Sequence, residues 1–237
     1  MTARLVAMSF EARTPKSVAG FWGSMLDRDV TETDDGFLLP GSPTQVGLAF
    51  HRGGQNRVAQ NRAHLHLTST DAADQHRVVA QALDLGASQV DVGQRPEEGH
   101  IVLADPDGNE FCVIEPHNSY LAGTGFLGEL ACDGTREVGV FWSAALGWPL
   151  VWDQDEETAI QSPIGGTKVA WGGPPVAPRV GRNRQLLVLA AEGGEPGDLA
   201  AEVDRLVGLG ARLLSVDQRG HGELADPDGN EFLLRPA

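Results

Sequence analysis

The chain has 237 residues, of which 41% are hydrophobic, 22% charged and 6% aromatic, with 30 glycines and 14 prolines. This composition is typical of a globular protein with many turns, and it excludes disordered and collagen-like chains. The formal net charge of −15 repels phosphate backbones and anionic lipids. We therefore expect no nucleic acid and no membrane among the partners.

The sequence also bears on cellular location and on disulfides. No apolar run approaches the roughly 18 residues of a transmembrane helix, and the first residues lack the long apolar core of a signal peptide. We predict a cytoplasmic protein. Cys112 and Cys132 are the only cysteines, and neither lies in a cluster that would hold structural zinc. Both are expected to be free thiols.

The first predicted elements are a strand at 5–12 and a helix that begins near Pro15, because proline is favoured in a first helical turn. Apolar residues then recur at the spacing of a helix with one buried face, namely at Val18, Phe21, Trp22, Met25 and Leu26. Asp27 stands where a left-handed cap would end this helix. Short strands are predicted at 29–33, 36–40 and 45–51.

The same order of elements follows after a loop at 52–62. We predict a strand at 63–69, a helix at 72–85, and strands at 88–92, 100–104 and 110–115. The last two strands form a hairpin whose turn is encoded by its residues. Asp105 caps the turn through its side chain, Pro106 presets φ, and Gly108 permits a positive φ.

The most informative feature is an internal repeat. The stretch LADPDGNEF at 103–111 recurs without change at 224–232, and the Phe-Trp dipeptide at 21–22 returns at 141–142. The chain is therefore two copies of one sequence, each containing two strand-helix-strand-strand-strand units. We expect domains at 1–117 and 124–237.

Paired βαβββ units, the Phe-Trp dipeptide late in the first helix and the closing DPDGNEF hairpin resemble the vicinal oxygen chelate superfamily, in particular its glyoxalase-like and bleomycin-resistance-like members. The resemblance covers nearly the whole chain, twice. It implies an α+β fold in which four βαβββ units form two half-barrel, cup-shaped mixed sheets with helices outside. Members include glyoxalase I, extradiol dioxygenases and metal-free proteins that sequester antibiotics, so the fold does not choose the activity. Which units pair in each cup is left open.

The superfamily's metal enzymes place His, Glu or Gln ligands at inward positions of particular strands, and the bound ion holds oxygens of the substrate. Mapped onto this sequence, those positions fall near Ala7 and Leu127 in the first strand of each copy, Val46 to Leu48 and Gly166 to Lys168 in the fourth, His64 and Leu186 in the fifth, and Cys112 and Leu233 in the last. Only His64 is a competent ligand. We therefore expect no catalytic metal and no other cofactor.

A metal site remains an alternative, because side chains two residues apart on a strand share a face. His64 with His66, and Glu110 with Cys112, then line one wall of a cup and offer two nitrogens, a carboxylate and a thiolate. This alternative is a metal-dependent lyase, isomerase or dioxygenase using His64, His66 and Glu110. Otherwise one histidine faces the cavity as a hydrogen-bonding group, and Glu110 is solvated or salt-bridged at the hairpin base.

Aromatic, histidine and arginine residues supply the remaining candidates. Phe37, Trp152 and Trp171 lie on predicted strands, where each either fills the core or stacks on a flat ligand. His100 and His221 occupy equivalent places, either as acid-base groups or as inherited copies. The arginines of the two middle loops either pair with the chain's own carboxylates or bind an anionic ligand; they are Arg57, Arg62, Arg179, Arg182 and Arg184.

We therefore predict a tandem glyoxalase-like protein, monomeric or homodimeric, that binds or sequesters a small organic molecule in one or both cups without a catalytic metal. The sequence does not decide whether a reaction is also catalysed. A further alternative is that the second copy is purely structural, because it carries Leu186 and Val188 where the first copy has His64 and His66.

Overall fold

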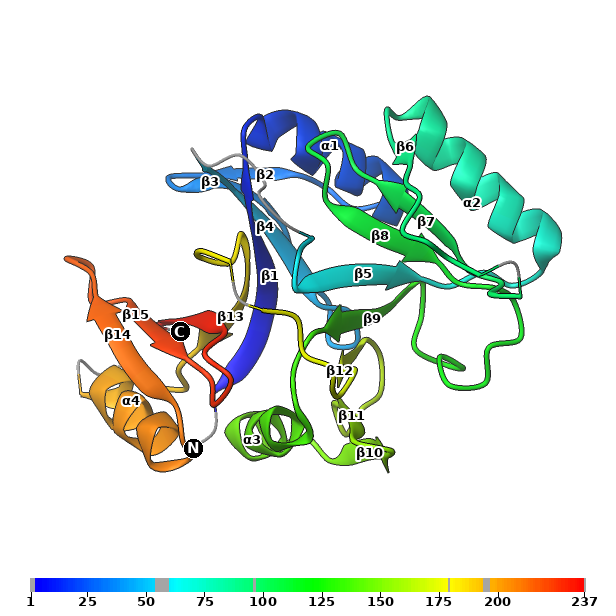
Figure 1. The fold of residues 1–237 in the computed structure, drawn as a ribbon. Helices are drawn as coiled ribbons and strands as arrows, with labels where there is room; N and C mark the ends of the chain where they lie inside the picture. The colour runs from blue at the N-terminus through cyan, green and yellow to red at the C-terminus, as the bar shows by residue number, and fades with distance from the viewer. Residues whose placement is uncertain (1–2, 54–59, 96, 179, 194–196, 237) are drawn as a thin grey trace.

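The computed structural model describes residues 3–53, 60–95, 97–178, 180–193 and 197–236. Four βαβββ units follow one another along the chain (Figure 1). The first unit consists of β1 (Arg4–Ala12), α1 (Pro15–Leu26), β2 (Thr31–Thr33), β3 (Gly36–Leu39) and β4 (Gly47–Arg52). The second consists of β5 (Ala63–Leu67), α2 (Ala72–Asp84), β6 (Ser88–Gln89), β7 (Ile101–Ala104) and β8 (Glu110–Val113).

The second copy of the repeat has the same plan, which confirms the predicted fold class. Its third unit consists of β9 (Leu127–Cys132), α3 (Arg136–Leu146), β10 (Leu150–Gln154), β11 (Glu157–Gln161) and β12 (Lys168–Trp171). The fourth consists of β13 (Gln185–Ala190), α4 (Asp198–Gly208), β14 (Arg212–Val216), β15 (Gly222–Ala225) and β16 (Glu231–Arg235).

Local sequence signals fix where the helices and the repeated turn begin and end. Proline starts α1, and Asp27 ends it in the left-handed conformation with φ 52°, as Gly147 ends α3 with φ 65°. In the turn between β7 and β8, the Asp105 carboxylate accepts hydrogen bonds from the backbone N–H groups of Asp107 and Asn109 at 2.9 and 3.0 Å. Gly108 has φ 85°, so the predicted roles of Asp105 and Gly108 are confirmed.

The strands form two open eight-stranded mixed sheets, and each sheet takes one unit from each copy of the repeat. The first and fourth units form the sheet of order β14-β15-β16-β13-β1-β4-β3-β2, which we call the terminal cup. The second and third units form the sheet of order β10-β11-β12-β9-β5-β8-β7-β6, which we call the central cup. At the middle of these sheets β1 pairs antiparallel with β13, and β5 pairs antiparallel with β9.

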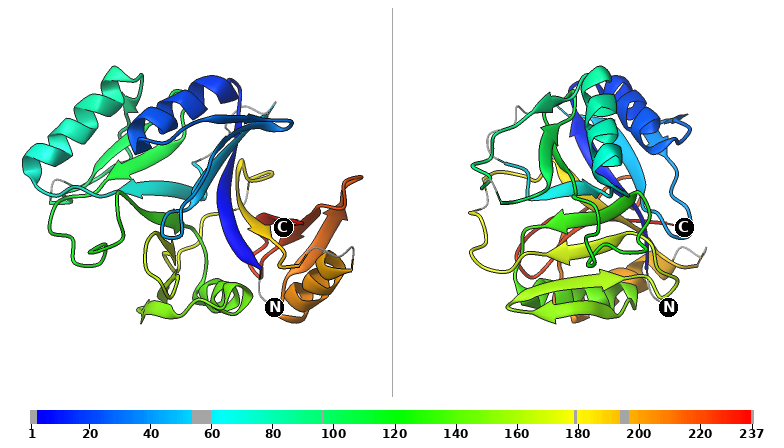
Figure 2. Two further views of the ribbon diagram at one scale, coloured as in Figure 1. Left: turned by 180° about the vertical axis from the view of Figure 1, so that it is seen from behind. Right: turned by 90° about the vertical axis from the view of Figure 1, so that its right-hand side faces the viewer.

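The helices cover the outer faces of the sheets, with α1 beside α2 and α3 beside α4 (Figures 1 and 2). One main hydrophobic cluster lies on this side of both sheets. Within it the rings of Trp22 and Phe111 lie 5.0 Å apart, as Trp142 and Phe232 do at 4.9 Å. Each copy therefore has its own core contacts, although neither copy contains a complete sheet.

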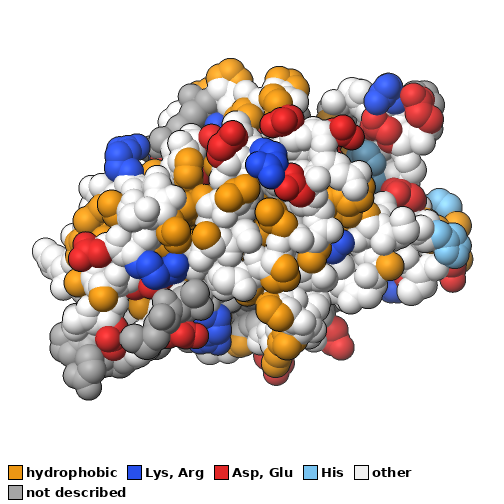
Figure 3. Space-filling model, turned by 90° about the horizontal axis from the view of Figure 1, so that it is seen from below, with side chains coloured by type: hydrophobic (Ala, Val, Ile, Leu, Met, Phe, Trp, Pro, Cys, Tyr) orange, Lys and Arg blue, Asp and Glu red, His pale blue; other side chains and the backbone are white. Residues whose placement is uncertain are grey.

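The surface is mixed in character. The face seen in Figure 3 carries acidic and basic side chains interspersed among apolar ones. Within the described segments, no helix combines the length and the apolar character needed to cross a membrane.

Candidate functional site in the central cup

The registers of four strands bring together one group of side chains in the central cup. His66 on β5 lies opposite Cys112 on β8 and opposite Glu129 on β9. Glu129 in turn lies opposite Lys168 on β12. Because paired residues on neighbouring strands point to the same face, these four side chains belong to one surface of the sheet. We call His66, Cys112, Glu129 and Lys168 the central group.

The terminal cup has the same registers but different chemistry. Ala7 lies opposite Gly47 and Val188, and Val188 lies opposite Leu233. Ala7 and Val188 belong to a small apolar cluster, against which Leu233 packs. The four positions that carry an imidazole, a thiol, a carboxylate and an ammonium in the central cup therefore carry no ligand atom in the terminal cup.

The structure corrects the position predicted for the first strand of the second copy. We expected this position near Leu127, but the residue opposite His66 is Glu129, two residues farther along β9. An irregularity in β9 between these residues places Leu127 in the hydrophobic core and Glu129 in the cup, so simple alternation of side chains does not reveal the position. The predicted first-strand position at Leu127 is therefore wrong, and in the central cup an acid, Glu129, stands at this position.

A chain of hydrogen bonds runs through the central group. His66 Nδ1 lies 2.7 Å from Glu129 Oε2, and the Tyr120 hydroxyl donates to Glu129 Oε1 at 2.6 Å. On its other side, His66 Nε2 lies 2.9 Å from His64 Nε2. Tyr120 belongs to the segment that joins the two copies, and no strand or motif signal identified it from the sequence.

The surroundings shift the pKa values of His64 and His66 in opposite directions. Burial, followed by the neighbouring His66, lowers the pKa of His64 to about 3. Burial also opposes protonation of His66, but hydrogen bonds with Cys112 and Glu129 and the Glu129 charge outweigh it and raise the His66 pKa to about 9. At neutral pH the pair therefore carries one positive charge, which lies on His66, and the His66 Nε2–H group donates a hydrogen bond to the neutral His64.

The carboxylate that faces His66 is itself stabilised in its charged form. Burial opposes ionisation of Glu129, yet the hydrogen bond from His66, its charge and the Tyr120 hydroxyl hold the pKa of this carboxyl below its usual range. Burial, with the Glu129 charge, raises the pKa of the Tyr120 phenol above its ordinary value. His66 and Glu129 thus form a buried ion pair in which Tyr120 remains a neutral donor.

Lys168 completes the central group with a second positive charge. Its ammonium hydrogen-bonds the Tyr120 carbonyl and lies 4.1 Å from the centre of the Tyr120 ring. Burial lowers the pKa of Lys168, against the attraction of Glu129. The Tyr120 ring also meets Trp152 edge to face at 5.7 Å, and Trp152 is 36% exposed. Trp152 therefore adjoins the central group through Tyr120, and its role in ligand stacking stays a prediction.

The four positions of the central group do not fit a resident divalent cation. Both Glu129 oxygens are already engaged, and the ammonium of Lys168 occupies one position and repels a cation. A different set of donors is available beside them, since ligand atoms of His64, His66 and Cys112 lie within 4.8 Å of one another. Glu110 is not in that set; it begins β8 and accepts a hydrogen bond from Asn61 Nδ2 at 3.0 Å.

The two other aromatic candidates lie on the core side of their sheets. Phe37 pairs with the buried Phe50 and packs against the main cluster. Trp171 is 2% exposed and stacks on Trp142 at 6.3 Å. Of the equivalent histidines, His100 lies close enough to His64 to help lower its pKa, and His221 pairs with Asp217 at 3.1 Å.

The described arginines of the middle loops pair with the chain's own carboxylates. Arg62 Nη2 lies 3.4 Å from Asp133 Oδ2, and Arg184 Nη2 lies 2.6 Å from Asp107 Oδ2. Arg182 contacts both Glu11 and Glu223. Arg57 and Arg179 lie outside the described residues.

Known proteins share this architecture. A family model described as a glyoxalase-like domain matches residues 7–114 and again 129–235, so that Ala7 and Glu129 open the two matches. The structure is similar to glyoxalase I from Zea mays (TM-score 0.65, 12% identity, 99% of this chain and 92% of that chain). It is also similar to a putative dioxygenase from Bacillus subtilis subsp. subtilis str. 168 (TM-score 0.63, 12% identity, 98% and 84%).

At these identities the likeness to solved structures establishes the fold and leaves the activity open. None of the curated proteins has a sequence that matches this chain. The two family-model matches cover most of the sequence and coincide with the two copies of the repeat. The chain is therefore a tandem member of the glyoxalase-like family, within the vicinal oxygen chelate superfamily.

Proposed function

We propose that the central cup binds a small organic molecule directly, in a binding or sequestration role, without a resident catalytic metal. The observation that carries this proposal is that the central group already contains its own cations. The His66 imidazolium and the Lys168 ammonium face the Glu129 carboxylate, where a metal site would need free electron pairs. The cation of this site is supplied by the protein itself.

The rest of the cup offers what such a ligand needs. Cys112 packs with Val102, Ile114 and Leu121 into a small apolar cluster against which Tyr120 rests. When His64 Nε2 accepts the proton of His66, His64 Nδ1 carries a hydrogen that a ligand can accept. An apolar wall with a few fixed polar groups is the usual composition of a small-molecule site.

Histidine side-chain NMR tests this proposal. With 15N-labelled histidine, a panel of small organic acids, phenols and alcohols is added with and without EDTA. We expect at least one compound to shift the His64 and His66 resonances equally in both conditions. The double variant His66→Val, Glu129→Ala installs the residues that the terminal cup carries as Val188 and Ala7, and it should abolish the shifts of the His64 resonances. His76→Gln, at an exposed position of α2, is the control. Shifts that vanish with EDTA would contradict the proposal.

A metal-dependent lyase, isomerase or dioxygenase is the second candidate, and the proximity of His64, His66 and Cys112 favours it. Glu129 behind His66 matches the carboxylate that often orients a metal-bound imidazole. This candidate predicts that Co2+ added at neutral pH gives a thiolate-to-metal absorption band that Cys112→Ser removes. Absence of the band with intact Cys112 would eliminate it.

We also propose that residues 1–117 and 124–237 are the two duplicated domains, folding interdependently. The second copy supplies Glu129 and Lys168 to the central cup, which argues against a purely structural role for it.

A further inference from the structure

The terminal cup contains a cavity of about 390 Å³, within the roughly 300–1,000 Å³ range of small-molecule sites. Leu186 and Leu233 are the large apolar side chains that line it, and Leu233 packs against the neighbouring cluster of Ala7, Ala49 and Val188. Ser9 lines the same space. None of these residues belongs to the central group, so this cavity is separate from the site described above.

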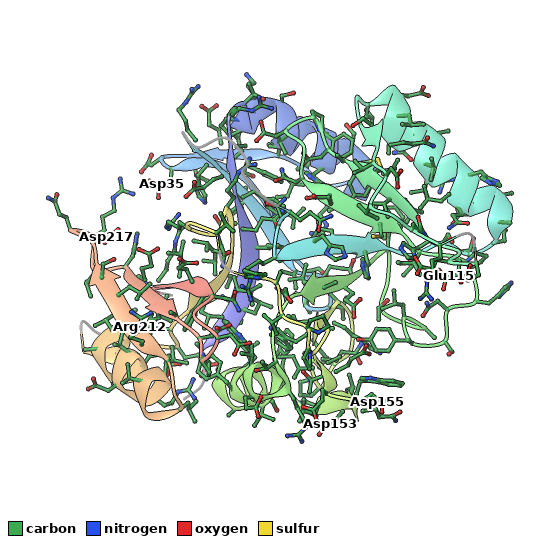
Figure 4. The ribbon with its side chains drawn as sticks, viewed as in Figure 1. Asp35, Glu115, Asp153, Asp155, Arg212 and Asp217 are labelled. Carbon is green, nitrogen blue, oxygen red and sulfur yellow. The ribbon has the colours of Figure 1, made fainter. Side chains whose placement is uncertain are left out.

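The carboxylates that line this cavity are all engaged by basic side chains of the cavity wall. Arg182 pairs with Glu11 and also with Glu223, the latter at 2.8 Å. His221 pairs with Asp217 at 3.1 Å. Arg219 Nη1 lies 2.7 Å from Asp35 Oδ1 and so joins the turn after β14 to the turn between β2 and β3, the two edges of this sheet. Figure 4 shows Asp35 and Asp217 on the same side of the molecule, at these two edges.

Two arginines of the cavity wall remain without a carboxylate. Among the described residues, neither Arg52 nor Arg235 forms an ion pair, and Arg235 Nε is buried with no hydrogen-bond partner. Leaving a guanidinium N–H buried and unpaired is costly, and a bound anion would remove that cost. Arg52 and Arg235 are therefore the guanidinium groups of this cavity that are free to bind an anion.

A third group of the wall limits the ligand further. His51 Nδ1 lies 2.9 Å from the Asp35 carbonyl oxygen, so Nδ1 carries a hydrogen that it donates to this carbonyl. His51 Nε2 is buried and has no partner within the described part of the chain. In the neutral ring this nitrogen is an acceptor, and it suits a hydroxyl group.

We propose that the terminal cup is a second binding site, which takes a small molecule with a flat or aliphatic apolar body, a carboxylate or similar anionic group bound by Arg235, and a hydroxyl accepted by His51. Leu186 and Leu233 contact the apolar body, and the four positions equivalent to the central group offer no atom that could hold a metal.

The fluorescent probe 6-hydroxy-2-naphthoate tests this proposal in the full-length protein. We expect saturable binding at one site, at least about tenfold tighter than that of 2-naphthol, which lacks the carboxylate. Arg235→Met should weaken probe binding by about tenfold or more, whereas Arg235→Lys, which keeps the charge, should retain most of it.

Arg212→Met is the matched control, because Arg212 is an exposed arginine of the same sheet that does not line the cavity (Figure 4). It should change the affinity less than twofold. His51→Phe should remove the advantage of 6-hydroxy-2-naphthoate over 2-naphthoate. The proposal would be overturned if 6-hydroxy-2-naphthoate and 2-naphthol bound equally well, or if Arg235→Met and Arg212→Met had equal effects. It would also be overturned if the probe did not bind at millimolar concentration. The double variant His66→Val, Glu129→Ala should bind the probe with unchanged affinity. This result distinguishes a failure of the central-cup proposal from a failure of the terminal-cup proposal.

Discussion

His66 and Glu129 form an ion pair of 2.7 Å between two strands that come from different copies of the repeat. The pair spans the seam between β5 and β9, so neither copy contains the site by itself. At the same seam of the terminal cup, Val188 faces Ala7. One duplicated scaffold therefore holds a charged group in one cup and an apolar cluster in the other.

The His66 pair predicts a specific dependence of stability on pH. The folded state raises the pKa of His66 from 6.5 to about 9, so protonation of His66 stabilises the folded protein. This stabilisation is fully present below pH 6.5 and is lost as the pH rises through 9. We expect the free energy of unfolding, measured with urea, to fall over this interval by on the order of a few kcal/mol.

Two variants assign this pH dependence to one residue. His66→Gln removes the titrating group, so its stability should be nearly flat between pH 6.5 and 9 apart from the background of other groups. His76→Gln, at the exposed position of α2, should keep the wild-type slope. A slope that survives in His66→Gln would contradict the assignment.

Tyr120 offers a direct optical measurement because it is the only tyrosine of the chain. Burial and the Glu129 charge raise its pKa above the ordinary value of 10.0. Absorbance at about 295 nm should therefore stay flat through pH 10–11 and rise only when the protein unfolds. Titration with a midpoint near 10 while the circular dichroism remains native would show that the phenol does not donate to Glu129.

The exchange of units between copies predicts the behaviour of half chains. A chain ending at residue 120 leaves β1 without β13 and β5 without β9, which exposes two long unpaired strand edges. We expect this half to aggregate or self-associate, and to give a cooperative unfolding transition only when residues 121–237 are supplied with it. Size-exclusion chromatography and thermal unfolding report the outcome. A folded monomeric half would disprove the interdependence of the two copies.

Features encoded by neighbouring residues were predictable from the sequence. The turn of Asp105 and Gly108, the helix start at Pro15 and the order of elements follow from local backbone preferences and side-chain spacing, and the structure has them. His64, His66 and Cys112 were candidates because alternate strand residues share a face, and the structure brings them together.

The rest of the site depends on contacts that local sequence does not encode. Glu129 was missed because the β5–β9 register is set by pairing between copies, in a strand that otherwise reads as apolar. Tyr120 was missed because it enters the site from an irregular segment. Phe37 and Trp171 lie on strands as predicted, yet they point to the core, since a strand pattern does not say which face is concave.

The metal content of the full-length protein, purified without chelator and dialysed at neutral pH, tests the central claim most directly. Because the two cationic side chains of His66 and Lys168 face the single carboxylate of Glu129, we predict far less than one equivalent of any divalent transition metal by elemental analysis. The central claim would be contradicted by one tightly held equivalent of zinc, nickel, manganese or iron that is lost in His64→Ala and Cys112→Ser but kept in His76→Gln.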